Sequence, residues 1–302
     1  MLARQDTSQV LDSILQLRTS PLFSKLGAAS LAPLAYHARA VKFPAGSIVA
    51  HRAEISNQLC HILEGTVRSS TGEVLGVREA LGGLALFSRI GMPFEAIAEN
   101  DVRGIVLPAD AVFEALEDDA ILLQHLIRAL ALQLLTERDR LGGERRVFTM
   151  SIAGPSAEEG SLDLVQRMIL IQRAQGLKRT GATALADAAR NTTPFRVPKG
   201  EFLWRRGDDP QYAYLIISGT VSALYDDGTP IHLGPAIAMG VLEPLAGVPR
   251  HYDLISNEEV WGLKSSLSRH FEAFEDHFQM ATDVLATLAG GILRVLCPGC
   301  AA

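Results

Sequence analysis

Apolar residues along the chain change from helical spacing to short strand-like runs and back again. Residues 8–18 and 27–38 carry apolar positions at helical spacing. From Val41 to about Leu107 the sequence consists of short β-type runs separated by turn signals such as Pro44-Ala45-Gly46. A short helix at 110–118 and a longer helix to about Leu141 follow. Short strands with frequent turns favour a sandwich, a barrel or a jelly roll.

The same order of elements occurs a second time. We expect helices at 161–175 and 183–190, strands from Phe195 to Leu263, and a closing helix over about 278–296. Residues 142–160 contain glycine, proline and mixed charge, which is typical of a linker. The pattern therefore predicts a first domain over 1–141, a linker over 142–160, a second domain over 161–296 and a tail over 297–302.

The duplication is visible residue by residue. Gly46 matches Gly200 at an offset of 154 (200 − 46 = 154), and Gly65 matches Gly219 at the same offset. Apolar positions of the two closing helices match at an offset of 158, so the second copy holds four extra residues within its strand region.

Two short motifs in each copy resemble those of cyclic-nucleotide-binding domains. An apolar-x-apolar-Pro-x-Gly motif stands at 41–46 and 195–200, and an apolar-x-x-Gly-x-Val motif stands at 62–67 and 216–221. The resemblance implies an α+β fold with two β-jelly-roll barrels, each flanked by N-terminal and C-terminal helices. Tandem copies also occur in regulatory subunits of cAMP-dependent protein kinase.

Ligand binding in that family depends on a phosphate-binding cassette, with a pattern close to Phe-Gly-Glu-x-Ala-Leu followed by Pro-Arg-x-Ala. Backbone N–H groups at the start of a short helix face the cyclic phosphate. The arginine pairs with the phosphate, and the glutamate accepts a hydrogen bond from the ribose 2′-hydroxyl. Loss of one partner leaves a polar ligand atom unpaired in a dry pocket, which costs ~1–3 kcal/mol.

The second copy keeps part of this cassette. Gly240 and the Pro249-Arg250 pair are retained, but Val241 replaces the glutamate and Tyr252 replaces the small alanine. The resemblance implies that candidate ligand-binding residues of the second domain are Gly240, Val241, Leu242, Glu243, Pro249, Arg250 and His251. The alternative is that Arg250 is an ordinary exposed arginine in a Gly-Val-Pro-Arg turn.

The first copy departs further from the pattern. Gly83 stands where the glutamate is expected, and the arginine position falls near Phe94. Its weaker candidate ligand-binding residues are Gly82, Gly83, Leu84 and Arg89.

Charge and cysteine content narrow the functional classes. The net charge of −6 does not favour a nucleic-acid partner, because phosphate binding calls for a basic surplus. No uncharged apolar run reaches about 18 residues, so we expect no membrane span and a cytoplasmic protein. Cys60 is expected to be a small buried side chain. Cys297 and Cys300 have two-ligand zinc spacing without a second pair, so no metal site is predicted, and their role stays open.

Three functional hypotheses follow. No catalytic motif is present, so we expect a non-enzymatic regulatory protein in which two degenerate barrels bind a protein partner without a cofactor. The alternative is a second-messenger sensor that binds cAMP or cGMP through the second domain. A transcription regulator is disfavoured, because only six residues follow the last predicted helix and 177–191 is better interpreted as the helix entering the barrel. A homodimer through the long helices is a further expectation from the resemblance.

Overall fold

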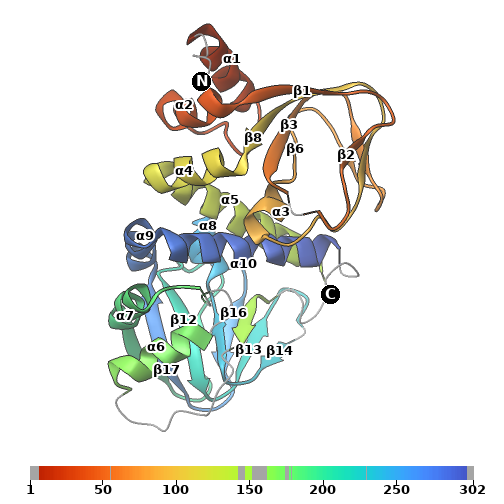
Figure 1. Ribbon diagram of the computed structural model, residues 1–302. Helices are drawn as coiled ribbons and strands as arrows, with labels where there is room; N and C mark the ends of the chain where they lie inside the picture. Colours follow the sequence, from red (N-terminus) through yellow and green to blue (C-terminus); the bar gives the residue numbers. More distant parts are fainter. Residues whose placement is uncertain are drawn as a thin grey trace. The chain divides into compact units, whose positions relative to one another are not determined.

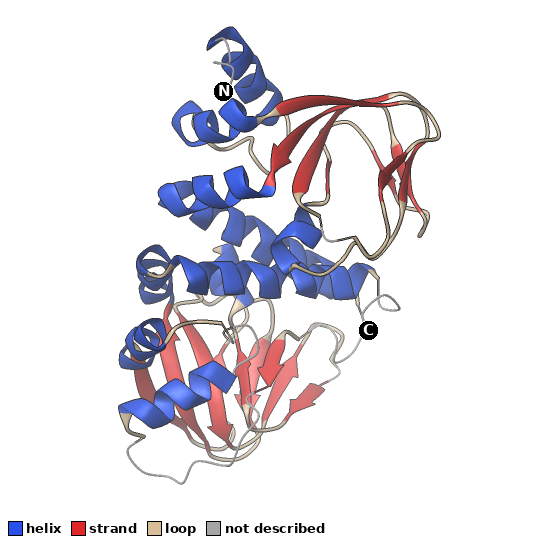
Figure 2. Cartoon of the chain, in the orientation of Figure 1, coloured by secondary structure: helices blue, strands red, loops and turns tan. Residues whose placement is uncertain are grey.

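The computed structural model describes residues 7–54, 56–141, 147–151, 162–173, 177, 179–228 and 230–297. The chain divides into two compact units (Figures 1 and 2). Unit 1 comprises Met1–Leu126 and Ala289–Ala302, and unit 2 comprises Ile127–Leu288. The two boundaries fall within the two longest helices, α5 and α10.

Unit 1 begins with helices and continues as a set of short antiparallel strands. Its elements are α1 (Thr7–Leu17), α2 (Ala28–His37), β1 (Arg39–Phe43), β2 (Ile48–Ala50), β3 (Gln58–Glu64), β4 (Val67–Ser69), β5 (Val74–Leu75), β6 (Ala80–Leu81), α3 (Gly83–Ser88), β7 (Ala96–Ala98), β8 (Val102–Pro108), α4 (Ala109–Asp118) and the first part of α5 (Ala120–Asp139), which continues into unit 2 from Ile127. One sheet has the order β1-β8-β3-β6 and the other the order β2-β7-β4-β5.

Unit 2 repeats this arrangement. Its elements are β9 (Thr149–Ser151), α6 (Leu164–Arg173), α7 (Ala182–Arg190), β10 (Thr192–Val197), β11 (Phe202–Trp204), β12 (Tyr212–Ser218), β13 (Val221–Leu224), β14 (Pro230–Leu233), β15 (Ile237–Met239), α8 (Leu242–Ala246), β16 (Asp253–Ser256), β17 (Val260–Ser266), α9 (Leu267–Asp276) and α10 (Phe278–Leu296), of which the part from Ala289 belongs to unit 1. Its sheets have the orders β10-β17-β12-β15-β9 and β11-β16-β13-β14.

The strand order identifies both units as jelly rolls and confirms the predicted α+β fold class. In each unit the first, eighth, third and sixth barrel strands form one sheet, and the second, seventh, fourth and fifth form the other. The barrel of unit 2 starts at β10, so β9 is an addition to this order. Strand β3 is buried over most of its length, because one face lines the barrel and the other is covered by helices such as α3.

The duplicated glycines have the same backbone conformation in both units. Gly46 and Gly200 have φ of 80° and 82°, and Gly65 and Gly219 have φ of 85° and 90°. This left-handed region favours glycine, which has no Cβ. At Gly65 and Gly219 an added Cβ would also collide with the carbonyl oxygens of Asp101 and Glu259. The repeated motif therefore encodes the tight turns of the barrel.

Strand β9 falls within the segment expected to be a linker. It pairs antiparallel with β15 and extends the larger sheet of unit 2 by one strand. The Arg138 Nη2 atom donates a hydrogen bond of 2.6 Å to the Val147 carbonyl and so holds the start of this segment. Residues 142–146 and 152–160 of the expected linker lie outside the described residues.

Helices α5 and α10 are long and apolar enough to cross a membrane by length and composition alone. Of their most apolar windows, 44% and 61% respectively are buried inside the structure. Buried core helices pass the same test, so the two helices are weak evidence for a span.

The structure describes two of the three cysteines, Cys60 and Cys297. Cys60 lies in β3 and is buried, as expected, and burial raises the pKa of its thiol to about 11. Cys297 is buried just beyond α10, whereas Cys300 lies outside the described residues. Among the described residues, no group of three or more His, Cys, Asp or Glu side chains could hold a metal ion.

Candidate functional site

The candidate site in unit 2 begins where β15 turns into the short helix α8. Gly240 makes this turn with a φ of +65°. A Cβ there would lie 2.8 Å from the Nη1 atom of Arg250 and 2.9 Å from the ring of Trp204. Glycine is therefore required at this position both for the backbone conformation and for the close approach of the arginine.

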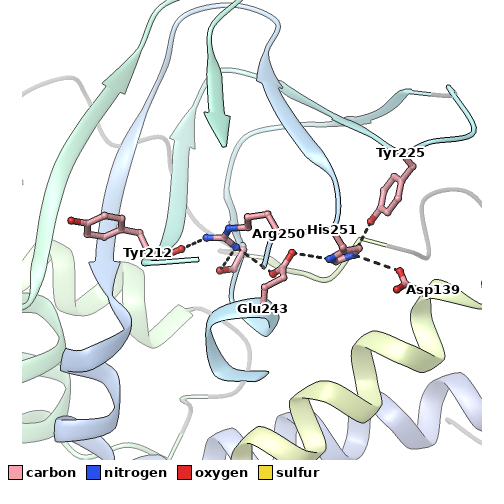
Figure 3. Close-up of polar contacts among 7 residues, drawn as sticks. Asp139, Tyr212, Tyr225, Glu243, Arg250 and His251 are labelled. Carbon is pink, nitrogen blue, oxygen red and sulfur yellow. Dashed lines mark hydrogen bonds and ion pairs between the residues drawn. The ribbon is translucent and has the colours of Figure 1, made fainter. Parts of the chain in front are cut away.

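Arg250 is buried, and its guanidinium is engaged by the protein itself (Figure 3). Its Nη1 atom donates to the Gly240 carbonyl at 3.0 Å and to Oε2 of Glu243 at 3.3 Å, while Nη2 donates to the Tyr212 carbonyl. The guanidinium also lies over the Trp204 ring, 4.2 Å from its centroid. With only 3% of the residue exposed, the alternative of an exposed turn arginine is wrong.

Glu243, in the first turn of α8, is the acidic partner in this arrangement and is 2% exposed. Its Oε1 atom lies 3.1 Å from Nδ1 of His251, close enough for an ion pair but without good hydrogen-bond geometry. Burial acts to raise the pKa of the Glu243 carboxyl, but His251 and the charge of Arg250 outweigh it and hold the pKa below its usual value. The carboxyl is therefore ionised at neutral pH.

His251 connects this pair to two groups at the edge of the site. Its Nε2 atom lies 3.5 Å from Oδ1 of Asp139 at the end of α5, and 3.5 Å from the hydroxyl of Tyr225 (Figure 3). The result is a continuous polar row of arginine, glutamate, histidine and aspartate. All four side chains belong to unit 2.

Aromatic side chains fill the barrel interior beside Arg250. Tyr252 is 2% exposed, stacks on Tyr225 with ring centroids 5.0 Å apart, and meets Trp204 edge-on at 5.5 Å. Burial raises the pKa of the Tyr252 hydroxyl well above its usual value, so the group stays neutral. Tyr252 and Trp204 belong to the buried core of this barrel.

The remaining candidates of unit 2 have different surroundings. Leu242 is 1% exposed and is part of the hydrophobic core, whereas Val241 is partly buried at the start of α8. Pro249 is exposed. The structure thus brings Gly240, Glu243, Arg250 and His251 together and leaves Pro249 outside the cluster.

The corresponding region of unit 1 is apolar. Gly82, in the left-handed conformation, precedes α3, which contains Gly83 and the partly buried Leu84. Arg89 is exposed and ends α3 with a φ of +57°. Phe94, near the expected arginine position, packs on the barrel core beside the buried Met92. The core of the first barrel therefore presents an aromatic ring near the position where the cassette pattern has a cation.

The sequence-based candidates did not include Asp139, Trp204, Tyr212 or Tyr225, and the sequence marked Tyr252 only as the replacement for a small alanine. Tyr212 contributes only its backbone carbonyl, which no side-chain pattern reveals. Trp204 and Tyr225 replace Ala50 and Thr71 of the first copy at the offset of 154. This gain of aromatic residues was the one available signal that the second interior is filled differently.

The repeat, the two jelly rolls and the position of the altered cassettes define a tandem protein of cyclic-nucleotide-binding-like fold. In both units the cassette departs from the family pattern at the glutamate position. In unit 2 the arginine is retained but is bound internally.

Comparisons with known proteins find similarity to solved structures only. No protein-family model and no curated protein matches the chain. One similar solved structure is the regulatory subunit of a cAMP-independent protein kinase A from Trypanosoma brucei, with 18% identity, coverage of 93% of this chain and 89% of that chain, and a TM-score of 0.37. Another is the regulatory domain of Toxoplasma gondii protein kinase A with cAMP, with 15% identity, coverage of 96% and 99%, and a TM-score of 0.37. A third is the regulatory subunit of a cAMP-independent protein kinase A from Trypanosoma cruzi bound to guanosine, with 17% identity, coverage of 93% and 88%, and the same TM-score. No functional assignment follows from likenesses of this size.

Proposed function

We propose that the chain is a non-enzymatic, cytoplasmic regulatory protein whose two degenerate cyclic-nucleotide-binding-like barrels bind a protein partner and need no nucleotide. One observation carries the proposal: the buried guanidinium of Arg250 already has its acceptors within the chain. These are the Glu243 carboxylate and the carbonyls of Gly240 and Tyr212. The arginine that would hold a cyclic phosphate is thereby used to fix α8 against the barrel.

A phosphate could take this place only by separating two buried charges. Removal of one partner from a buried ion pair typically costs ~3–5 kcal/mol, because the other charge is left without compensation. A charge-assisted hydrogen bond to a phosphate returns only ~1.5–3 kcal/mol. The ionised Glu243 carboxylate would also repel the incoming anion. Internal pairing therefore outweighs ordinary nucleotide binding at this site.

The second candidate function is a second-messenger sensor that acts through unit 2 alone. Arg250 and Gly240 lie together beside α8, which is the place that the family resemblance implies for a phosphate. Such a sensor would need a ligand that brings its own cation, or a ligand small enough to enter beside Tyr252. Unit 1 offers no comparable buried arginine among its described residues.

Titration calorimetry of the full chain with cAMP and cGMP tests the proposal. We expect no heat of binding up to millimolar nucleotide. Micromolar binding that is abolished by Arg250→Ala would overturn the nucleotide-free function. A melting scan with cyclic mononucleotides, cyclic dinucleotides and guanosine gives a second readout, because a ligand at 100 times its Kd adds ~2.7 kcal/mol of stability.

The variant itself distinguishes a structural arginine from a ligand-binding one. We expect Arg250→Ala to lower the free energy of unfolding by ~3–5 kcal/mol without any ligand, because Glu243 stays buried without its cation. Arg196→Ala is a matched control, since Arg196 forms an exposed ion pair with Glu259 and its loss should change stability by at most ~1 kcal/mol. Equal stability of Arg250→Ala and wild type would show that Arg250 has no structural role.

A further inference from the structure

Unit 2 contains a cavity of about 150 Å³ outside its barrel. It lies between the helix-facing side of the larger sheet and helices α6, α7, α9 and α10, with one end at α8. On β12, Leu215 faces this layer, whereas its neighbour Ile216 faces the barrel core that contains Trp204 and Tyr252. The cavity is therefore on the opposite side of the sheet from the Arg250 cluster.

The floor of the cavity is built from small side chains. Ala213 on β12 stands opposite Ser265 on β17 in the strand register, and Ala188 on α7 lies in the facing wall. Ala188, Ser265 and His270 are all partly exposed, which fits side chains that border an open space.

Unit 1 shows what this layer looks like when it is filled. The corresponding void is only about 20 Å³, and Leu34 and Leu59 line it. These leucines precede Ala188 and Ala213 by 154 positions, which is the offset of the repeat. Leu107 stands opposite Leu59 in the register, where unit 2 has Ser265 opposite Ala213. Three leucines of the first copy are thus replaced by small residues, and their volume becomes the cavity.

The wall of the cavity also gains one polar pair. The Oγ atom of Ser265 lies 2.8 Å from Nε2 of His270, at positions where unit 1 has Leu107 and Val112. Burial lowers the pKa of His270 to about 4, so the ring is neutral at pH 7. The Thr192 hydroxyl donates instead to the Ala189 carbonyl, and the Thr287 hydroxyl to the Asp283 carbonyl. Ser265 and His270 are therefore the polar pair available to a molecule in the cavity, beside the phenol of Tyr214, which also lines it.

We propose that this cavity binds a small, neutral, largely apolar molecule that carries one hydrogen-bonding group directed at Ser265 and His270. A largely apolar cavity of about 150 Å³ is large enough for a benzene-sized ligand. Lysine, arginine, aspartate and glutamate are absent from the described lining residues, and burial of an unpaired charge is strongly unfavourable. An aromatic ring with a hydroxyl or N–H group fits both the volume and the chemistry.

A bound molecule would also contact elements that organise the rest of unit 2. Val241 and Leu245, at the start and within α8, line the cavity, as do Val284 and Leu288 of α10. The same helix α8 carries Glu243, the partner of Arg250. Occupancy of the cavity therefore stabilises the α8 position that the internal ion pair requires. This inference goes beyond the proposed function, because the cavity lies outside the barrel and its ligand is not a nucleotide.

Binding of phenol, indole and toluene to the full chain tests the proposal, with benzoate as the charged counterpart. Titration calorimetry and saturation-transfer NMR measure the affinities. We expect phenol and indole to bind, toluene to bind more weakly, and benzoate not to bind. Failure of all three neutral probes to bind the wild-type chain overturns the proposal.

Cavity-filling variants locate the site. Ala213→Leu restores the residue type of the first copy and should weaken phenol and indole binding at least tenfold. Ala182→Leu is the matched control, since Ala182 is exposed on α7 and the same enlargement there should leave binding unchanged. Unchanged binding by Ala213→Leu overturns the proposal. If that variant does not fold, Ala188→Val fills the opposite wall and carries the same expectation.

Two further measurements identify the polar end of the cavity. His270→Val should remove the preference for phenol over toluene while toluene still binds. Bound phenol should show nuclear Overhauser contacts to the Val284 methyl groups. Absence of these contacts in a complex that does form would place the ligand elsewhere and overturn the assignment.

Discussion

Gly240 shows how a single residue can decide the geometry of the second cassette. Its φ of +65° and the close approach of Arg250 and Trp204 leave no space for a side chain. Gly200 also has a positive φ, +82°, but nothing lies within 4 Å of the Cβ that it lacks. A comparison of the two glycines therefore separates the cost of a left-handed backbone from the cost of overpacking.

We predict that Gly240→Ala lowers the free energy of unfolding by ~2–5 kcal/mol. About 1–2 kcal/mol of this comes from the left-handed conformation and about 1–3 kcal/mol from overpacking against Arg250 and Trp204. Gly200→Ala, as the matched control, should show only the first contribution. Urea denaturation of both variants measures the difference. Equal losses would mean that Arg250 and Trp204 can move aside without cost.

The individual residues of the site could be predicted only in part. Arg250 and Gly240 follow from the cassette pattern, but Glu243 lies seven positions before Arg250 and fits no expected spacing. The pairing arises because the first turn of α8 points the Glu243 carboxylate back at the guanidinium. The direction of the Glu243 side chain cannot be predicted from sequence spacing, because it depends on where β15 ends and on the conformation of Gly240.

At the scale of elements, the layer between sheet and helices differs most between the two units. In unit 1, Leu59 of β3 is 1% exposed and packs near α3, where Gly83 would bring a Cβ within 3.2 Å of the leucine. In unit 2 the matching Ala213 leaves open space. The same fold thus tolerates a filled layer and a hollow one.

We predict that Leu59→Ala destabilises unit 1 by ~2–5 kcal/mol, because the removed methyl groups leave a cavity that the layer between sheet and helices closes only in part. Val74→Ala is a control at an exposed strand position and should change stability by ~0.5 kcal/mol or less. The measurement is chemical denaturation of the full chain, followed by a probe in unit 1. A loss under ~1 kcal/mol for Leu59→Ala would indicate that the layer relaxes freely.

The elements themselves were largely accessible from sequence. The Pro-x-Gly and Gly-x-Val motifs place the first turns of each barrel, and the helical stripes of α5 and α10 are long enough to recognise. Strand β9 was missed, because three residues in a segment rich in glycine and charge carry no strand pattern of their own. Strand β9 forms because it pairs with β15, which lies more than 80 residues further along the chain. The residues of β9 alone therefore do not predict the strand.

At the scale of the whole molecule, the buried His61 and the partly buried His270 couple stability to pH. The pKa of His270 falls from its ordinary value of 6.5 to about 4, because burial disfavours the charged ring. Burial also lowers the pKa of His61 in unit 1. A histidine with a lowered pKa in the folded state binds protons more readily when unfolded, so its contribution is complete above pH 6.5 and is lost as the pH falls.

We predict that the unfolding free energy declines between pH 6.5 and about pH 4, with roughly 3 kcal/mol of the loss due to His270. Below about pH 4.5 protonation of Glu243, whose pKa is lowered in the folded state, should reduce stability further. Urea denaturation across this range gives the slope. His270→Val, which carries the residue type of Val112, should flatten the slope above pH 4.5 and retain the contribution of His61. An unchanged slope in that variant would exclude His270 as a source.

Strand β9 determines whether a fragment of unit 2 keeps the edge of its larger sheet paired. Because β9 covers the outer edge of β15, the larger sheet ends in a three-residue strand supplied by the segment between the two repeats. A fragment that begins at Leu162 would lose this strand and present the bare backbone of β15. Exposed sheet edges recruit further strands from other molecules. Fragments of unit 2 should therefore include Thr149–Ser151 to keep the edge of β15 paired.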